Sequence, residues 1–247
     1  MSGAGLDAAV VVDLGSFLVD AAVTAPPGQV LGILGPNGAG KSTLLRALAG
    51  LAPIADGYVR LGGRVLDDPA RGIRTAPERR GTGLVFQDYL LFPHLTALDN
   101  VAYGLRARGL RRTAARARAA EWLDRVGLAD RADQPAGTLP YGQKRALELA
   151  LALALDPRLL LLDEPTAGMG AEDVQRTVEL VRQVSAGRTV VLVEHNMTVV
   201  ADLADRVTVL RGGAVLVEGA YADVRQDPRV VEAYLGSGTG AGADARS

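Results

Sequence analysis

A short glycine-rich segment constrains the fold of this chain more than any other feature. It follows an apolar stretch, residues 30–34, and precedes residues 42–49, whose apolar side chains recur at helical spacing. The pattern G-x-x-x-x-G-K-[ST] is matched completely by Gly35, Pro36, Asn37, Gly38, Ala39, Gly40, Lys41 and Ser42. A strand that turns through such a loop into a helix indicates an α/β fold that binds phosphate. We call residues 35–42 the phosphate loop.

Each residue type in the phosphate loop suits a nucleotide. Glycines allow a tight turn with backbone N–H groups directed at phosphate oxygens, and the following helix directs its positive end at the same anion. We expect Lys41 to contact the β- and γ-phosphates of ATP, Ser42 to bind Mg²⁺, and Thr43 to contact the α-phosphate. A glycine-rich turn that binds nothing needs neither the lysine nor the hydroxyl. Lys41 and Lys144 are the only lysines among 27 basic residues, which favours a chemical requirement for Lys41.

Two carboxylates follow a second apolar strand, residues 159–162. Charges at the carboxyl end of a buried strand in an open α/β sheet lie where ligands bind. We expect Asp163 to hold Mg²⁺ and Glu164 to polarise the water that attacks the γ-phosphate. An Asp-Glu pair is also common where an ordinary strand reaches solvent, but the phosphate loop favours the catalytic interpretation.

The remaining chain alternates strand and helix patterns. Strands are expected at residues 10–13, 17–23, 59–61, 65–66, 84–86, 189–193 and 207–210. Helices are expected at residues 100–108 with Thr96 as a capping residue, 113–126, 143–155, 172–185 and 197–203. Such alternation predicts a parallel sheet covered on both faces. We expect an ATP-binding core of residues 1–87 and 138–235, an inserted helical subdomain of residues 88–137, and a disordered tail of residues 236–247.

Composition excludes several classes of protein. The absence of cysteine excludes disulfide frameworks and Cys-type metal sites, and it suits a cytoplasmic protein. A net charge of −1 gives no global attraction to nucleic acid or anionic lipid. The N-terminal residues do not resemble a signal peptide, and no apolar run approaches the roughly 20 residues of a membrane span.

Further segments, in order and spacing, resemble the ATP-binding cassette (ABC) family, the ATPase subunits of membrane transporters, over about residues 8–235. Gln87, in residues 85–88, lies where that family has its glutamine loop, and His195, in residues 193–196, resembles its switch histidine. Residues 167–170 resemble its dimer-contact loop. The family's signature segment is matched in position by Leu139, Pro140, Tyr141, Gly142 and Gln143.

The resemblance implies an α/β fold of the P-loop NTPase type: an ABC-type nucleotide-binding domain with an N-terminal antiparallel β-subdomain and an inserted helical subdomain. It implies that Gln87 contacts Mg²⁺ or the attacking water and that His195 contacts both the γ-phosphate and the attacking water. The chain is expected to form a head-to-tail dimer, with itself or a homologous ATPase subunit, in which the partner's signature segment completes each ATP site. Implied partners are membrane permease subunits and an extracytoplasmic solute-binding protein, which would place the chain on the cytoplasmic face of the membrane.

Some positions depart from the family pattern. The usual signature serine is Pro140 and the first signature glycine is Tyr141, while the usual aspartate of the dimer-contact loop is Gly170. Proline offers neither a hydroxyl nor an N–H group, so the contact of the signature segment with phosphate is expected to be weakened or replaced. Residues 85–95 resemble molybdate and related oxyanion importers, whereas residues 193–197 and 232–236 resemble branched-chain amino-acid importers. The cargo and the direction of transport are therefore left open.

A phenylalanine and a cluster of arginines each allow more than one interpretation. Phe17 lies where an aromatic ring could stack on adenine, and it fits a core position on a strand equally well. An arginine cluster in the helical insertion consists of Arg106, Arg108, Arg111, Arg112, Arg116 and Arg118. The cluster could bind nucleic acid or lipid headgroups, or contact the edge of a permease. Because no aromatic residues interleave to stack on bases, a solvated helix face is favoured and no nucleic acid is expected. The alternative functions are a soluble ABC ATPase that acts on nucleic acid and an ATP-dependent clamp with weak hydrolysis.

Overall fold

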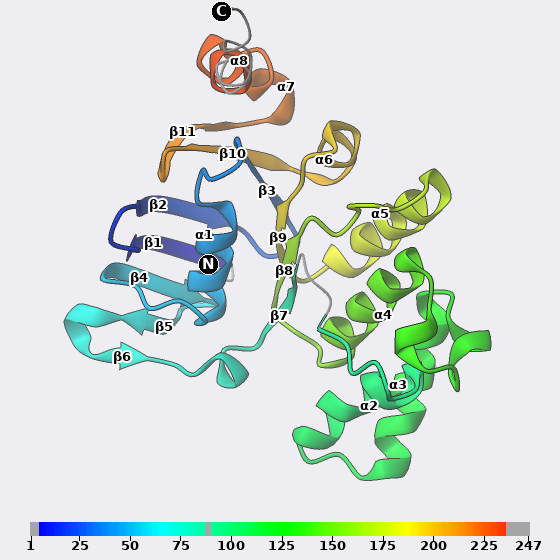
Figure 1. Cartoon of the computed structure of the whole chain (residues 1–247). Helices are drawn as coiled ribbons and strands as arrows, with labels where there is room; N and C mark the ends of the chain where they lie inside the picture. The colour runs from blue at the N-terminus through cyan, green and yellow to red at the C-terminus, as the bar shows by residue number, and fades with distance from the viewer. Residues whose placement is uncertain (1–4, 87–89, 236–247) are drawn as a thin grey trace, which may run out of the picture.

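The computed structural model describes residues 5–86 and 90–235, and Figure 1 shows how their elements are arranged. The strands are β1 (Leu6–Asp13), β2 (Leu18–Ala25), β3 (Val30–Leu34), β4 (Asp56–Leu61), β5 (Arg64–Asp68), β6 (Ile73–Arg74), β7 (Thr82–Val85), β8 (Leu159–Asp163), β9 (Thr189–Val193), β10 (Arg206–Arg211) and β11 (Ala214–Gly219). The helices are α1 (Lys41–Ala49), α2 (Ala97–Ala107), α3 (Arg112–Arg125), α4 (Tyr141–Ala154), α5 (Ala171–Ser185), α6 (Met197–Leu203), α7 (Tyr221–Val224) and α8 (Pro228–Leu235). Within these residues, no helix combines the length and the apolar character that crossing a membrane requires.

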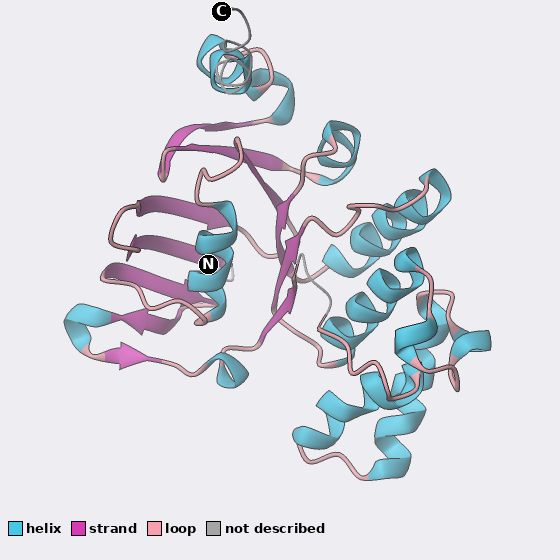
Figure 2. Cartoon of the chain, in the orientation of Figure 1, coloured by secondary structure: helices cyan, strands magenta, loops and turns pink. Residues whose placement is uncertain are grey.

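The described strands form one continuous sheet in the order β6-β5-β4-β1-β2-β11-β10-β3-β9-β8-β7. The run β10-β3-β9-β8-β7 is parallel, as the alternation of strands and helices predicts. The run β6-β5-β4-β1-β2 is antiparallel, which confirms the expected antiparallel part near the N-terminus. The two parts join where β11, antiparallel to β10, pairs with β2 at Ala214 and Asp20. Figure 2 shows α1 enclosed between the antiparallel and the parallel strands.

The parallel strands separate two hydrophobic cores. Alternate side chains of a strand point to opposite faces, so a strand covered on both faces is apolar throughout. In β8, Leu159 and Leu161 pack with α1 and the antiparallel strands, whereas Leu160 and Leu162 pack with α2 to α5. This double burial explains why residues 159–162 are an unbroken run of leucine.

The element boundaries follow local chemistry. The Thr96 hydroxyl accepts a hydrogen bond of 3.0 Å from the Asp99 N–H and so caps α2, as predicted. Gly50 ends α1 with φ of 81°, a conformation that glycine adopts without strain. The sequence pattern does not predict β6, β11, α7 or α8. The first and third of these have only two and four residues, which is too short for a periodic pattern to be visible.

A buried arginine fixes α1 to the antiparallel strands. Arg80 is 2% exposed and forms an ion pair with Asp67 of β5. It also donates to the carbonyl oxygens of Ala47 and Leu48, each at 3.3 Å, at the end of α1. The Ala47 carbonyl oxygen also accepts a hydrogen bond from the N–H of Gly50, the C-cap residue. A cation at a helix C-terminus is favourable. Arg80 therefore holds the helix whose first turn completes the phosphate loop.

Replacing this arginine is expected to destabilise the fold strongly. In Arg80→Met the carboxylate of Asp67 stays buried without its cation, so the free energy of unfolding should fall by about 3–5 kcal/mol. The exposed neighbour Arg79 provides the control, and Arg79→Met should change the free energy by less than about 0.5 kcal/mol. Urea denaturation of both variants measures the difference. Equal stabilities for the two variants would contradict the role given to Arg80.

Candidate functional site

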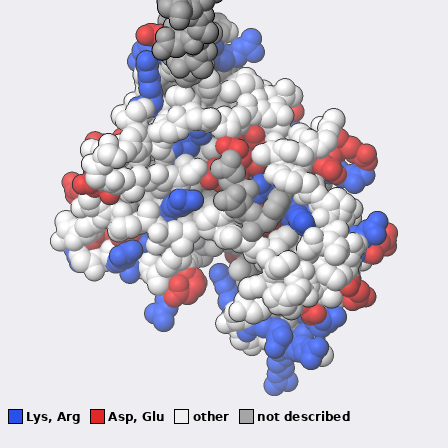
Figure 3. All heavy atoms as spheres, in the orientation of Figure 1, with Lys and Arg blue, Asp and Glu red and all other residues white. Residues whose placement is uncertain are grey.

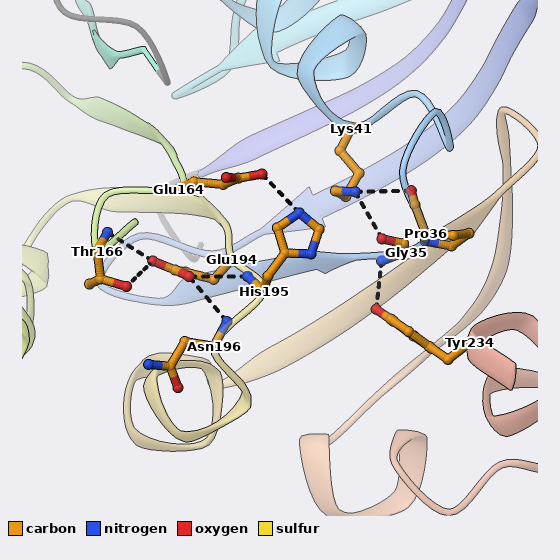
Figure 4. A network of polar contacts seen from close by, with 9 residues as sticks. All are labelled: Gly35, Pro36, Lys41, Glu164, Thr166, Glu194, His195, Asn196 and Tyr234. Atoms are coloured by element: carbon orange, nitrogen blue, oxygen red, sulfur yellow. Dashed lines mark hydrogen bonds and ion pairs between the residues drawn. The ribbon is translucent and has the colours of Figure 1, made fainter. Parts of the chain in front are cut away.

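The phosphate loop, Asp163, Glu164 and His195 meet at one edge of the parallel sheet. Strand β9 lies between β3 and β8 and is parallel to both, so the carboxyl ends of the three strands are adjacent. The phosphate loop follows β3, Asp163 ends β8, and His195 follows β9 by two residues. The residues that the sequence predicts are thus brought together by strand pairing. Figure 4 shows the side chains of Lys41, Glu164 and His195 among them.

The backbone of the phosphate loop takes conformations that require glycine. Gly35 has φ of 146°, and a Cβ atom there would overlap the carbonyl oxygen of Leu210. Gly40 has φ of 100° and precedes α1 without a side-chain cap, so no side chain occupies the N–H groups of the first helical turn. Uncapped N–H groups at a helix N-terminus are the usual donors to a phosphate.

Lys41 is buried and lies across the phosphate loop. Its Nζ donates hydrogen bonds of 2.8 Å to the Gly35 carbonyl oxygen and 3.0 Å to that of Pro36. An ammonium has three N–H donors, so these two bonds orient the group and leave one donor for a ligand. Burial lowers the pKa of Lys41, and the charges of Glu164 and Asp163 oppose this shift. A phosphate anion beside Lys41 would also raise its pKa and so favour the charged ammonium.

The Asp163 carboxylate and the Ser42 hydroxyl fit a divalent cation. Asp163 is 7% exposed, and burial raises its pKa, while a hydrogen bond with Ser42 opposes that rise. Within residues 5–86 and 90–235, its Oδ1 has no hydrogen-bond partner. Buried polar atoms rarely remain unpaired, and carboxylate and hydroxyl oxygens are the ligands that Mg²⁺ prefers. This unpaired Oδ1 atom lies at the residue that the sequence predicts to hold Mg²⁺.

A hollow of about 570 Å³ opens in front of the phosphate loop. Its described lining consists of Phe17, Asn37, Gly38, Ala39, Gly40, Lys41, Ser42, Thr43 and Glu164. Phe17 also packs partly against the core formed by α1 and the antiparallel strands. The ring is therefore both a core side chain and a wall of the hollow, so stacking on adenine stays a prediction.

Glu164 and His195 face each other at the ends of β8 and β9. The distance between Glu164 Oε1 and His195 Nε2 is 2.8 Å, and the imidazole ring points toward the carboxylate in Figure 4. Glu164 has φ of 51°, an uncommon value for a residue with a side chain, which costs about 1 kcal/mol or more and occurs often at functional sites. Its N–H donates to the Val193 carbonyl oxygen at 2.9 Å, which ties the residue to β9.

Glu194 accepts four hydrogen bonds within the site, a role that the sequence does not predict. The residue is 3% exposed. One carboxylate oxygen accepts from the Thr166 N–H at 3.0 Å and from the Thr166 hydroxyl at 2.5 Å. The other accepts from the N–H groups of His195 at 3.0 Å and Asn196 at 3.2 Å. Glu194 therefore joins the turn that carries His195 to the segment after Glu164.

The signature segment lies elsewhere on the chain. The described lining of the hollow includes none of residues 139–143. Pro140 is the N-cap of α4 and makes no side-chain cap bond, so the first helical turn starts without one. Tyr141 is 44% exposed, and its ring lies against Gly168 of the dimer-contact loop. The signature segment thus contacts the dimer-contact loop within one chain rather than its own phosphate loop.

Gln87 lies outside the described residues, but Phe86 before it and Leu90 after it both form hydrogen bonds with α4. Arg145 donates to the Phe86 carbonyl oxygen, and Glu148 accepts a hydrogen bond of 3.0 Å from the Leu90 N–H. The two side chains form a buried ion pair of 2.8 Å. Burial raises the pKa of Glu148 to about 7, against the opposing effects of the Leu90 N–H and Arg145. The helix that begins at the signature segment therefore anchors Phe86 and Leu90.

The arginine cluster lies at the far end of the helical layer, where Figure 3 shows blue side chains gathered over the region of α2 and α3. Arg116 pairs with Asp99, and Arg108 donates to the Leu155 carbonyl oxygen at 2.9 Å. These contacts give two of the arginines structural partners in the fold. That the remaining arginines form a solvated helix face rather than a binding surface stays a prediction.

The site and the sheet together define a class of protein. A phosphate loop between a parallel strand and a helix, with an aspartate at the end of a neighbouring strand, is the arrangement of P-loop nucleotide-binding proteins. The family model "ABC transporter" matches residues 18–167. This chain belongs to the ABC transporter family, which confirms the predicted resemblance and the fold class. A second model, "Branched-chain amino acid ATP-binding cassette transporter", matches residues 214–239.

Individual relatives agree with this assignment. The chain is 43% identical over 217 residues to the molybdenum import ATP-binding protein ModC of Mycobacterium tuberculosis, covering 85% of this chain and 59% of ModC. The chain thus spans about three fifths of the length of this curated relative. The ADP conformation of MJ1267, an ATP-binding cassette of an ABC transporter, superposes with a TM-score of 0.80 at 26% identity, covering 94% of this chain and 98% of MJ1267. A dimeric post-hydrolysis structure of MJ0796 with ADP and Pi gives a TM-score of 0.76 at 27% identity, covering 87% and 98%.

The four hydrogen bonds of Glu194 predict a stability effect. Glu194→Gln replaces one acceptor oxygen by an NH₂ group, which would face N–H groups and leave them unpaired. The free energy of unfolding should fall by about 1–3 kcal/mol. The exposed Glu78 provides the control, and Glu78→Gln should have little effect. Urea denaturation measures the free energy of unfolding of both variants. Equal values would contradict the structural role given to Glu194.

Proposed function

We propose that this chain hydrolyses ATP and couples the reaction to the movement of a solute through separate membrane permease subunits. The observation that carries this proposal is the Glu164–His195 pair at 2.8 Å, which lies beside the hollow in front of the phosphate loop. The carboxylate and the imidazole are the groups that a hydrolase needs beside the terminal phosphate.

The proposed reaction is the attack of water on the γ-phosphorus. A new P–O bond forms while the bond between the γ-phosphorus and the β–γ bridging oxygen breaks, which yields ADP and phosphate. Glu164 accepts a proton from the water, and its carboxylate is oriented by His195. Lys41, held by the Gly35 and Pro36 carbonyls, stabilises negative charge on the β- and γ-phosphate oxygens. Phosphate-loop N–H groups bind the remaining oxygens.

The metal and the adenine extend this site. When bound, Mg²⁺ neutralises charge on the phosphate oxygens and orients them for in-line attack. Ser42 and Asp163 would hold it, and the resemblance to the family adds Gln87. Phe17 would stack on the adenine ring from the wall of the hollow.

We infer a head-to-tail dimer, with a second copy or a homologous ATPase subunit. The placement of residues 139–143 supports it, because the signature segment does not line the hollow of its own chain and could contact the nucleotide of a partner. The dimeric MJ0796 structure supports it also. In this arrangement Gly142 and the first turn of α4 offer N–H groups to the partner's phosphate, in place of the missing serine at Pro140. Residues 1–87 and 138–235 would form the ATP-binding core, and residues 88–137 the inserted helical subdomain.

The partners and the location follow from the transporter role. Permease subunits in the membrane would bind the chain at the inner face of the cell membrane, on the cytoplasmic side. An extracytoplasmic solute-binding protein would deliver the cargo. The name of ModC indicates molybdenum import, whereas the model matched by residues 214–239 indicates branched-chain amino acids. Import is the direction that the name of ModC supports.

A second candidate is an ATP-dependent clamp with weak hydrolysis. Pro140 at the N-cap of α4 and Gly170 at the N-cap of α5 favour it, because neither supplies a side-chain hydroxyl or carboxylate to a dimer interface. The steady-state ATPase rate of the wild type distinguishes the two candidates.

Removing the proposed base tests the reaction. Glu164→Gln keeps the size of the side chain but cannot accept the proton of water, so kcat should fall by a factor of about 100 or more, while Mg-ATP still binds. The exposed Glu121 on α3 is the control, and Glu121→Gln should keep the wild-type rate. Rates measured by phosphate release that are equal for wild type and Glu164→Gln would exclude Glu164 as the base.

Removing the loop lysine tests binding rather than chemistry. Lys41→Ala deletes the cation that contacts phosphate, so the Kd for Mg-ATP should rise by a factor of about ten or more. Arg79→Ala removes an exposed cation and should bind Mg-ATP like the wild type. Isothermal titration calorimetry measures both variants. Normal affinity in Lys41→Ala would show that the phosphates lie somewhere other than the phosphate loop.

A further inference from the structure

The C-terminal part of the chain contacts the phosphate loop at two residues. The Gly213 N–H, in the turn between β10 and β11, donates to the Ala39 carbonyl oxygen at 3.2 Å. The Gly35 N–H donates to the hydroxyl oxygen of Tyr234 in α8 at 2.9 Å, across 199 positions of sequence. Figure 4 shows the tyrosine reaching from α8 to Gly35. The loop is therefore held at its first residue and at its fifth by residues of the C-terminal part.

Gly35 is fixed through both of its backbone polar groups. Its N–H is bound by Tyr234, and its carbonyl oxygen is bound by Lys41 Nζ at 2.8 Å. The Leu210 carbonyl oxygen lies so close that the residue has no room for a Cβ atom. The position of Gly35 therefore sets where Lys41 is directed, and Tyr234 is the only side chain of the described residues that holds the N–H of Gly35.

Tyr234 is itself firmly placed. It packs, half-buried, on a small core that includes Val207 and Val209 of β10 and Val230 of α8. Burial raises the pKa of Tyr234, while the hydrogen bond from Gly35 opposes this shift, so the hydroxyl stays protonated near neutral pH. A neutral hydroxyl accepts an N–H bond without bringing a negative charge beside the phosphates.

We propose that Tyr234 is a positioning residue for nucleotide binding, which makes the C-terminal segment β11–α8 a structural part of the nucleotide site. The proposal rests on the proposed function of the phosphate loop. Tyr234 touches no phosphate, because it acts through the N–H of Gly35. Residues 214–239 match a family model of branched-chain amino acid ATP-binding cassette transporters. The hydrogen bond between Tyr234 and Gly35 suggests that this segment helps to position the phosphate loop.

The expected size of the effect follows from conformational populations. Without the hydroxyl, the Gly35 N–H loses its partner, and the phosphate loop spends part of its time in other conformations. A ligand that binds one conformation loses apparent affinity in proportion to the population of that conformation. A neutral hydrogen bond contributes about 0.5–1.5 kcal/mol, which corresponds to a rise in Kd of about two- to tenfold.

The experiment compares Tyr234→Phe with Tyr221→Phe in the full chain. Tyr221, the first residue of α7, packs on the same small core and is the matched control for loss of a hydroxyl there. We expect Tyr234→Phe to raise the Kd of Mg-ATP and the KM of hydrolysis about two- to tenfold at unchanged kcat. Tyr221→Phe should bind like the wild type. Wild-type affinity in Tyr234→Phe, or equal losses in both variants, would overturn the proposal.

Hydrogen exchange gives a second readout that needs no nucleotide. The Gly35 amide should be protected in the wild type and exchange at least about threefold faster in Tyr234→Phe, while its exchange in Tyr221→Phe stays unchanged. Unprotected exchange of this amide in the wild type would overturn the proposal. A wild type that fails to bind Mg-ATP, with the Gly35 amide protected by Tyr234, would instead contradict the proposed function and leave the contact in place.

Discussion

The parallel pairing of β3, β9 and β8 determines which residues meet in the site. Because β9 lies between the other two strands, the phosphate loop, the Asp163–Glu164 pair and His195 share one edge of the sheet. Each strand is buried on both faces, so a shift of register would move every side chain of the strand into the wrong core. The hydrophobic pattern that stabilises the sheet therefore also sets the geometry of the site.

The sequence predicted those parts of the site whose chemistry is local. The phosphate loop, the carboxylates after β8 and the histidine after β9 are each recognisable within a few residues, and strand pairing brings them together. The sequence does not predict the roles of Glu194, Arg80 and Tyr234, because the partners of these side chains are distant in sequence. A glutamate beside a histidine shows nothing of the Thr166 groups it binds 28 positions away. Gln87 lies outside the described residues, so its role stays a prediction.

The site is supported by three groups of polar contacts from different parts of the chain. Arg80 holds the C-terminal end of α1, Glu194 holds the turn of His195, and Tyr234 holds the first glycine of the phosphate loop. Each group binds backbone atoms rather than a ligand, so each acts on the position of the groups that do the chemistry. Pro140 and Gly170 lie at the N-caps of α4 and α5 and take part in none of these three groups of contacts.

A crystal structure with Mg²⁺ and a non-hydrolysable ATP analogue would test this arrangement of the site. We expect the β- and γ-phosphates in the hollow in front of the phosphate loop, with Lys41 on one side and Glu164 and His195 beside the γ-phosphate. We expect the metal at Ser42 and Asp163. A nucleotide bound at any other surface, or phosphates remote from Lys41, would contradict the proposed site.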